Sequence, residues 1–184
     1  KSLEEEQAAL RGNAIGRFES FIGNYPDDPV YTPDAMFRLS ELYFERSYLA
    51  YLDDQDSYEE RIDGWTPDSE EPEPPEPEFH YEPTIAMMQR LVTEYPGYRL
   101  VDGARYLLGY CLGEQGEDER AKDVYERLVA EAPNSRFTAE VWTRIGEYYF
   151  NTSDLERAAA AYNKVLGHYD SPFYDKALYK LAWT

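Results

Sequence analysis

The sequence predicts an all-α protein, a right-handed α-solenoid of stacked antiparallel helix pairs. One observation is a repeat of 36–37 residues, measured from Gly109 to Gly146 and from Gly146 to Ala182. Another is that apolar residues within each repeat recur at helical intervals. Because each helix pair has an apolar face that it cannot bury alone, we expect the pairs to stack into one array over residues 1–184.

The second helix of each pair, helix B, carries one apolar stripe. Four segments have apolar or aromatic residues at +4, +7, +8 and +11, counted from their first residues Ala14, Thr84, Ala121 and Ala158. This spacing follows one face of a helix and excludes a strand. Pro26, Pro96 and Pro133 then stand where a helix should end. We expect helices at 14–25, 83–95, 118–132 and 154–169, with their tyrosines Tyr25, Tyr95, Tyr125, Tyr162 and Tyr169 in the core.

The first helix of each pair, helix A, carries a small residue at one fixed place. These residues are Ser40, Gly109, Gly146 and Ala182. Because glycine lowers helix propensity, it indicates a close approach of the partner helix of the same pair. The predicted A helices cover 32–63, 102–115, 138–151 and, in part, 174–184.

Local signals mark the helix ends. Thr32-Pro33-Asp34 offers an N-cap followed by a proline, and Ser153-Asp154-Leu155-Glu156 fits a capping box with Ser153 as the cap. Gly116 stands where the helix that begins near Asp102 should end.

An acidic, proline-rich insert of about residues 49–80 interrupts the pair formed by 32–63 and 83–95. Residues 51–80 hold 12 Asp and Glu and a single basic residue, Arg61. Tyr51, Tyr58, Ile62 and Trp65 recur at near-helical spacing. We therefore expect the A helix to extend to about Asp63 and to pack Tyr51, Tyr58 and either Ile62 or Trp65 against the array. Residues 66–78, with five prolines, should be extended, exposed and mobile. The segment is either a passive insertion or an acidic element that competes for basic surfaces. Such an element would either recruit a cationic partner or shield the groove from one.

Charge and motifs restrict the function. The chain has 37 acidic residues against 18 Lys and Arg, a net charge of −19, which argues against nucleic acid as a partner and suits a basic or neutral one. No apolar run is long enough for membrane insertion. We find no nucleophile motif, phosphate loop or metal-ligand spacing, so the sequence predicts no enzyme activity, cofactor or metal. Cys111 is expected to be a buried, inert thiol.

The chain begins near a B helix and stops within an A helix. We therefore expect either a piece of a longer array or self-association through an open C-terminal end.

The repeat resembles the tetratricopeptide repeat. The skeleton is Gly109, Ala121, Tyr125 and Pro133, followed in the next repeat by Gly146, Ala158 and Tyr162. The period of 36–37 differs from the family's 34. The connectors, such as Tyr169-Asp170-Ser171-Pro172, are similar to those of bacterial cell-envelope variants, including the outer-membrane assembly lipoprotein and the Tol–Pal coordinator. This similarity implies a place in the cell envelope or periplasm; the alternative location is the cytoplasm.

The resemblance also implies a function, a scaffold that binds a protein or peptide segment in a concave groove lined by the A helices. Carried over onto this sequence, the groove residues are Phe37, Glu41, Phe44, Tyr106, Tyr110, Glu114, Glu147, Phe150 and Tyr179. Aromatic anchors among charged residues are typical of protein-binding surfaces. The alternative is a groove that binds glycan or peptidoglycan, since aromatic faces stack on sugars.

Overall fold

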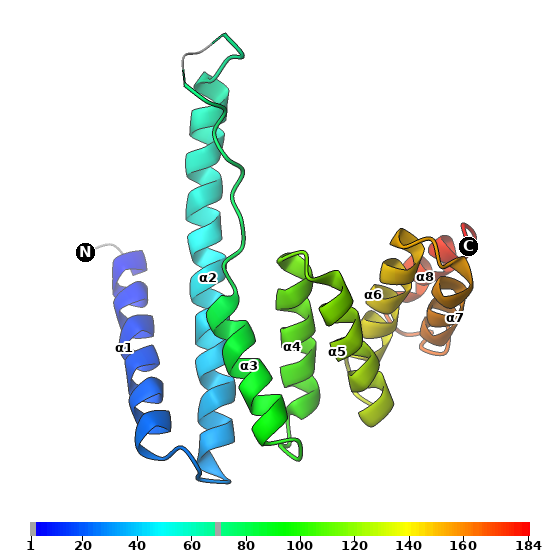
Figure 1. Cartoon of the computed structure of the whole chain (residues 1–184), viewed down its shortest axis with the longest axis horizontal. Helices are drawn as coiled ribbons and strands as arrows, with labels where there is room; N and C mark the ends of the chain where they lie inside the picture. The colour runs from blue at the N-terminus through cyan, green and yellow to red at the C-terminus, as the bar shows by residue number, and fades with distance from the viewer. Residues whose placement is uncertain (1–2, 69–70) are drawn as a thin grey trace. The chain divides into compact units, whose positions relative to one another are not determined.

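The structure is a computed structural model that describes residues 3–68 and 71–184. Within these residues all regular secondary structure is α-helical, in the order α1 to α8 (Figure 1). The fold class is therefore all-α, an α-solenoid of helix pairs, as the sequence predicts. The chain divides into two compact units, Lys1–Arg90 and Leu91–Thr184, which we describe in turn.

The first unit pairs α1 (Leu3–Asn24) with α2 (Tyr31–Gly64), and α3 (Glu82–Glu94) begins within it. The helix expected at 14–25 thus begins at Leu3. Residues 3–10 are exposed and carry no buried stripe, so the apolar pattern gave no sign of this extension. Acidic residues in the first turn, together with Ala8 and Ala9, favour helix there through the dipole and through propensity.

The start of α2 differs from the predicted cap. The helix begins at Tyr31, and the carboxylate of Asp28 accepts the backbone N–H groups of Val30 and Tyr31 at 2.9 and 2.7 Å. The hydroxyl of Thr32 donates to the carbonyl of Tyr25. Thr32 therefore ties the turn to the end of α1 and is not the N-cap.

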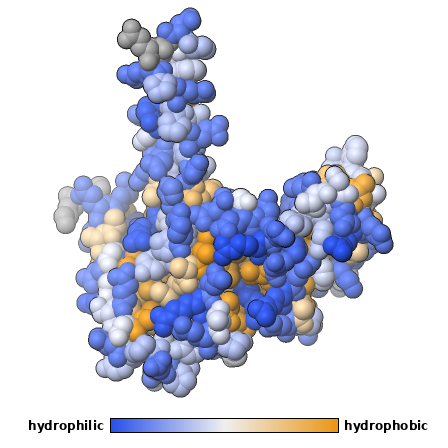
Figure 2. Space-filling model, viewed as in Figure 1, coloured by the Kyte–Doolittle hydropathy of each residue, from blue (hydrophilic) through white to orange (hydrophobic). Residues whose placement is uncertain are grey.

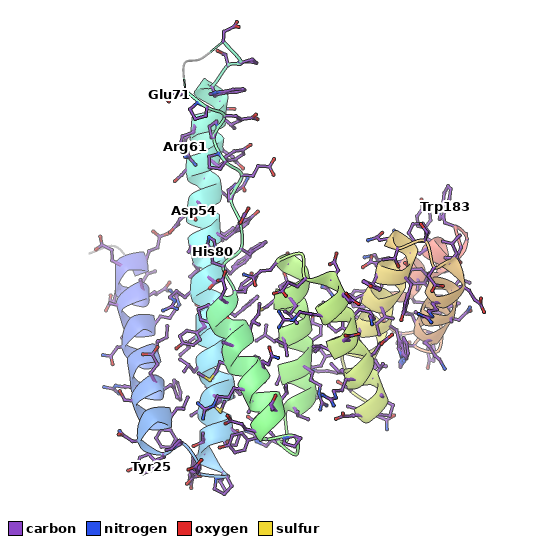
Figure 3. All side chains as sticks on the ribbon, in the orientation of Figure 1. Tyr25, Asp54, Arg61, Glu71, His80 and Trp183 are labelled. Atoms are coloured by element: carbon purple, nitrogen blue, oxygen red, sulfur yellow. The ribbon has the colours of Figure 1, made fainter. Side chains whose placement is uncertain are left out.

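The long helix α2 includes the first half of the insert. Its 34 residues correspond to about 50 Å, and Figure 1 shows its second half rising beyond α1. On the face that Figure 2 shows, this projecting part is mainly hydrophilic. Asp54 and Arg61 mark its course in Figure 3. The A helix thus continues through the first half of the insert and ends at Gly64, close to the predicted Asp63.

The second half of the insert returns along α2. Described residues 65–68 and 71–81 form no helix, and most of them are exposed. Ser69 and Glu70 lie outside the described residues. The Trp65 indole N–H donates to the carbonyl of Glu71 at 3.0 Å. Mobility of this segment stays a prediction.

Stacked aromatic rings hold the end of the returning segment on α2. Phe79 stacks on Tyr51 with ring centroids 3.8 Å apart, and Tyr81 stacks on both Phe79 and Phe44 at 5.1 Å. Tyr81 is fully buried. We expected Tyr51 to pack against the helices of the array, whereas its ring packs on the insert's own return.

The second unit contains α4 (Val101–Glu114), α5 (Asp118–Glu131), α6 (Thr138–Asn151), α7 (Leu155–Val165) and α8 (Tyr174–Leu181). Each helix contacts the next along the chain. α7 ends before the expected residue 169, because the chain turns through Gly167, whose N–H bonds the Lys164 carbonyl at 3.3 Å. α8 ends at Leu181, before the expected residue 184.

The repeated spacing of glycine and tyrosine has a direct structural meaning in this unit. A β-carbon placed on Gly109 would lie 2.5 Å from Cε1 of Tyr125, and one on Gly146 would lie 2.5 Å from Cε1 of Tyr162. Both tyrosines are buried. Gly109 and Gly146 therefore sit where the A and B helices of one pair touch, as predicted.

The other three tyrosines that we expected in the core differ in their burial. Tyr95 is half-buried, whereas Tyr25 and Tyr169 are 57% and 76% exposed. The expectation of core positions for these two was wrong. Each lies just beyond the end of its helix, α1 or α7, where the chain turns away from the stripe.

The turns between α4 and α5 and between α6 and α7 are two copies of one structure. Gly116 has φ +74° and Ser153 has φ +63°. In both, the next residue's N–H returns to the preceding helix, from Glu117 to the Leu112 carbonyl at 2.9 Å and from Asp154 to the Tyr149 carbonyl at 2.8 Å. Gly116 ends its helix as predicted, whereas the N-cap of α7 is Asp154 and not Ser153.

Candidate functional site

The predicted groove tyrosines of α4 are held by neighbours on and just before α6. The ring of Tyr106 stacks on Phe137 with centroids 4.3 Å apart, and its hydroxyl donates to Glu140 at 2.9 Å. The guanidinium of Arg144 lies over the ring of Tyr110 at 5.1 Å and is paired with Glu140 at 2.9 Å. The carboxylate of Glu140 thus contacts Tyr106 directly and Tyr110 through Arg144.

Burial and the bond to Glu140 change the acidity of Tyr106. Desolvation is the larger cause and the carboxylate the second, and together they raise the pKa of Tyr106 to about 12. Tyr106 is therefore a neutral hydrogen-bond donor at physiological pH, and its role in this contact is to position Glu140.

The predicted residues Glu114 and Glu147 line one small pocket of about 190 Å³. Its walls come from the end of α4, the start of α5 and the second half of α6. They comprise Gly113, Glu114, Asp118, Ala121, Lys122, Tyr125, Arg144, Glu147, Tyr148 and Asn151. We call this set the acidic pocket.

The cations of the acidic pocket already have anionic partners. Lys122 pairs with Asp123 and, at 3.6 Å, with Glu126, and the hydrogen bond to Asp123 is the main cause that raises the pKa of Lys122. Arg144 pairs with Glu140. The wall residue Glu147 pairs with Lys176 of α8 at 2.6 Å.

Two carboxylates of the acidic pocket, Glu114 and Asp118, differ from the paired side chains described above. In the part of the chain that the structure describes, neither Glu114 nor Asp118 forms an ion pair. Both are exposed. The pocket therefore presents open negative charge beside the ring of Tyr148, which already has Lys122 at 5.7 Å from its centroid.

The last two predicted residues of this unit lie towards α8. Phe150 packs against the core between α6 and α7, and the ammonium of Lys180 lies 5.1 Å from its ring centroid. Tyr179 is 63% exposed and meets Trp183 edge to face at 6.1 Å. Among the predicted aromatic residues of this unit, Tyr179 is the one classed as exposed; Tyr106, Tyr110 and Phe150 are half-buried.

Three predicted residues belong to the first unit. Phe37 is 9% exposed and lies in the core, so we leave it out of the candidate site. Glu41 pairs with Arg38 at 2.6 Å, and Phe44 stacks on Tyr81. The predicted set thus divides between the units, and the acidic pocket brings together only Glu114 and Glu147.

Sequence reasoning missed several pocket residues, namely Asp118, Lys122, Arg144 and Tyr148. Two of them stand at the start of a B helix, whereas the groove register considered only A helices. The sequence does place Asp118 and Lys122 soon after the predicted turn at Gly116. Because this turn brings the start of α5 beside the end of α4, it could have indicated that these two residues lie close to Glu114.

Two protein-family models match the second unit. A family model described as tetratricopeptide repeat matches residues 104–135, which cover α4 and α5, and a second model with this description matches residues 139–167, which cover α6 and α7. The chain contains tetratricopeptide repeats. The matched stretches include both glycine–tyrosine contacts, so the residues that carried the resemblance are those that form the helix pairs.

Solved structures are similar to this chain at low sequence identity. The crystal structure of BtubC (BKLC) from P. vanneervenii is 14% identical with a TM-score of 0.50; the match covers 91% of this chain and 57% of that one. This chain therefore spans little more than half the length of that protein. TTC0263, a thermophilic TPR protein in Thermus thermophilus, is 17% identical with a TM-score of 0.42, covering 96% and 94%. No curated protein matches the chain.

No described helix is both long enough and apolar enough to cross a membrane.

Proposed function

We propose that the tetratricopeptide repeats of the second unit bind a basic segment of a partner protein, with a lysine or arginine of that segment in the acidic pocket. Such repeats generally mediate protein–protein interaction. The observation that carries the proposal is the pair of open carboxylates, Glu114 and Asp118, in a pocket whose own cations are already paired.

The size and chemistry of the acidic pocket suit one long basic side chain. A volume of about 190 Å³ accommodates a side chain and not a folded domain. A guanidinium or ammonium that enters the pocket would replace part of its water shell by charge-assisted hydrogen bonds to Glu114 and Asp118. The net charge of −19 would also attract a basic segment from a distance.

Further contacts along α6 and α8 would give the segment an apolar anchor. Tyr179 offers an exposed ring, and Trp183 beside it is also 63% exposed. Exposed aromatic rings of this kind contribute strongly to peptide affinity when they are buried on binding. We therefore place an apolar residue of the segment near Tyr179.

The alternative of a glycan groove has less support. Sugar stacking needs free aromatic faces, whereas Tyr106 is covered by Phe137 and Tyr110 by Arg144. We do not propose it. A cell-envelope location stays a prediction of the connector sequences, and self-association through the exposed Leu178, Tyr179 and Trp183 stays a prediction that sedimentation would check.

The proposal is tested with a displayed library of random linear peptides selected against the chain. Selected sequences should carry Lys or Arg, and their affinity should fall as salt rises from low to physiological concentration. Glu114→Gln together with Asp118→Asn should weaken binding at least tenfold. Glu119→Gln with Glu156→Gln, two exposed acidic residues outside the pocket, makes the same change in net charge and should have little effect.

Selection of peptides without basic residues would contradict the proposal. So would an equal loss of affinity in the control pair, because binding would then respond to overall charge and not to the pocket. Circular dichroism should show unchanged helical content in both double variants, since all four side chains are exposed.

A further inference from the structure

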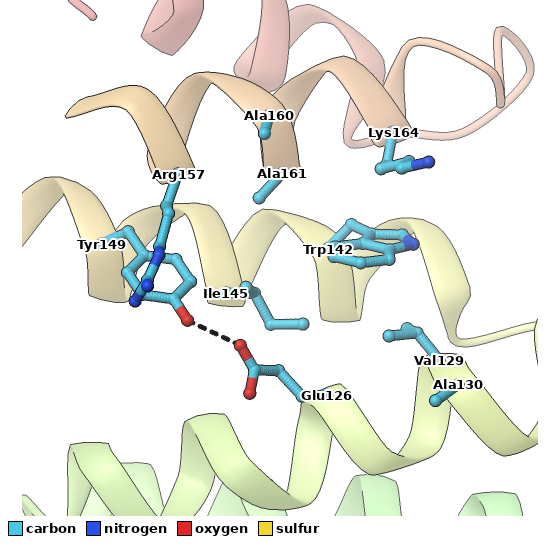
Figure 4. A pocket seen from close by; sticks show the side chains of 10 residues that line it. All are labelled: Glu126, Val129, Ala130, Trp142, Ile145, Tyr149, Arg157, Ala160, Ala161 and Lys164. Atoms are coloured by element: carbon cyan, nitrogen blue, oxygen red, sulfur yellow. Dashed lines mark hydrogen bonds between the residues drawn. The ribbon is translucent and has the colours of Figure 1, made fainter. Parts of the chain in front are cut away.

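A second pocket of the repeats lies between α5 and α7 and is unrelated to the predicted groove. Figure 4 shows that α6 forms its floor while α5 and α7 form its two walls. Its volume is about 440 Å³. The lining is mainly apolar and comprises Glu126, Val129, Ala130, Trp142, Ile145, Tyr149, Arg157, Ala160, Ala161 and Lys164. We call this set the α5–α7 pocket.

The floor of the α5–α7 pocket is on a different side of α6 from the acidic pocket. Trp142, Ile145 and Tyr149 recur at intervals of three and four, so they form one stripe of the helix. The α6 residues of the acidic pocket are Arg144, Glu147, Tyr148 and Asn151, none of which belongs to that stripe. The repeats therefore present two separate surfaces.

The length of the floor corresponds to a short helical ligand. Trp142 and Tyr149 are two turns apart, which is about 10 Å along α6. Arg157 and Lys164 are also two turns apart along the wall formed by α7. Two apolar side chains of an amphipathic helix, four residues apart and thus about 6 Å along its axis, fit within this length.

The charges at the rim of the α5–α7 pocket are not equivalent. Glu126 accepts a hydrogen bond from the Tyr149 hydroxyl at 2.7 Å and pairs with Lys122 at 3.6 Å. Arg157 pairs with Asp154 at 3.5 Å and lies over the Tyr149 ring. Lys164 is exposed and forms no ion pair within the described parts of the chain. The open charge at this rim is thus positive, in a chain of net charge −19.

We propose that the α5–α7 pocket docks an amphipathic helix of a partner protein, with two apolar side chains over Ile145 and Trp142 and an acidic residue at Lys164. The apolar lining supplies the burial that drives docking, and Lys164 sets the direction of the helix. This partner chemistry is opposite in charge to that proposed for the acidic pocket, so the two surfaces would bind different segments.

The test uses the full 184-residue chain and a displayed library of amphipathic helical peptides, in which the apolar spacing and the charged positions are randomised. Selected peptides should share large apolar residues four apart and an Asp or Glu beyond them. Ala160→Glu places a charge in the exposed mouth and should weaken these peptides at least tenfold. Lys164→Glu should weaken them roughly fivefold and favour peptides with lysine in place of the acid.

Matched variants separate this surface from the acidic pocket. Arg17→Glu makes the same charge change as Lys164→Glu in the first unit, and Glu114→Gln alters only the acidic pocket; neither should change affinity for the helical peptides. With Trp65→Phe and Trp183→Phe, Trp142 is the one remaining tryptophan, and its emission should shift on binding.

Three results would overturn the proposal. The first is enrichment of no helical peptide. The second is enrichment of peptides whose affinity is unchanged by Ala160→Glu or whose binding leaves Trp142 emission unaltered. The third is self-association of the chain that Ala160→Glu abolishes, which would assign the pocket to a second copy of the protein.

Discussion

Gly146 of α6 faces the ring of Tyr162 of α7 so closely that a β-carbon on the glycine would lie 2.5 Å from Cε1 of the tyrosine. Tyr162 is fully buried. The same contact joins Gly109 to Tyr125 one repeat earlier. The pairing of a glycine with a tyrosine is thus the contact that repeats in the two helix pairs α4–α5 and α6–α7.

Replacing Gly146 by leucine should overpack this contact and lower the free energy of unfolding by about 1–3 kcal/mol or more. Thermal unfolding measures the loss. Gly12→Ala is the matched control, because Gly12 is an exposed residue of α1 where an added methyl group would meet no atom within 4 Å, and alanine should stabilise that helix by up to about 1 kcal/mol. An unchanged melting temperature for the leucine variant would show that the register is wrong.

Exchanging residues between the two copies of the turn should have opposite effects. Ser153 has φ +63°, a conformation that glycine adopts without strain, so Ser153→Gly should stabilise the fold by about 1 kcal/mol. Gly116→Ser, at φ +74°, should destabilise it by a similar amount. Urea unfolding of both variants checks this, and a loss of stability on Ser153→Gly would be inconsistent with a strained turn.

Alkaline pH should destabilise the repeats through their buried tyrosines. Burial raises the pKa of Tyr162 to about 12, with Glu147 adding to the shift, whereas an unfolded tyrosine titrates near 10. The unfolded state therefore loses its proton first, and the stability that Tyr162 contributes is complete below about pH 10 and falls as the pH rises towards 12.

Tyr162→Phe isolates this effect. Its buried hydroxyl has no hydrogen-bond partner among the described residues, so the change should alter stability at pH 7 by less than about 1 kcal/mol. Between pH 9 and 11 the variant should lose less stability than the parent chain. Identical pH profiles of the two proteins would count against the buried position of this ring.

Phe79→Ala should release the returning half of the insert from α2. Its ring stacks on Tyr51 and Tyr81, and no regular secondary structure holds the described residues 71–81 in place. Amide hydrogen exchange in this stretch should accelerate, while that of α4–α7 stays unchanged. Glu76→Ala, at an exposed position of the same segment, should leave exchange as it is; equal acceleration in both would mean that the stack does not hold the segment.

The sequence could predict the parts of the fold that depend on local periodicity. Tyr125 and Tyr162 fall on regular stripes, and the glycines opposite them recur with the same period, so both helix pairs were foreseeable. The N-terminal extension of α1 was not, because residues 3–10 are exposed and helix propensity alone gives no stripe. Ser153 was read as a cap because its type suits one, whereas its backbone conformation depends on the turn around it.

The candidate site was predictable only in part. Glu114 and Glu147 were expected from the register of the A helices, and both line the acidic pocket. Phe37 was expected in the groove but lies in the core, since the register gives a position along a helix and not the packing of its neighbours. Asp118 enters the pocket through the turn between α4 and α5, which no single-helix pattern reports.

The most direct measurement of the central claim is a double-mutant cycle between Asp118 and the basic residue of a peptide selected for the acidic pocket. Affinities are measured for the parent chain and Asp118→Asn, each with the arginine peptide and its neutral citrulline counterpart. Direct contact predicts a coupling of about 1 kcal/mol, so that loss of either charge removes most of the effect of the other. Strictly additive effects of the two changes would contradict the account, because the peptide's cation would then bind elsewhere.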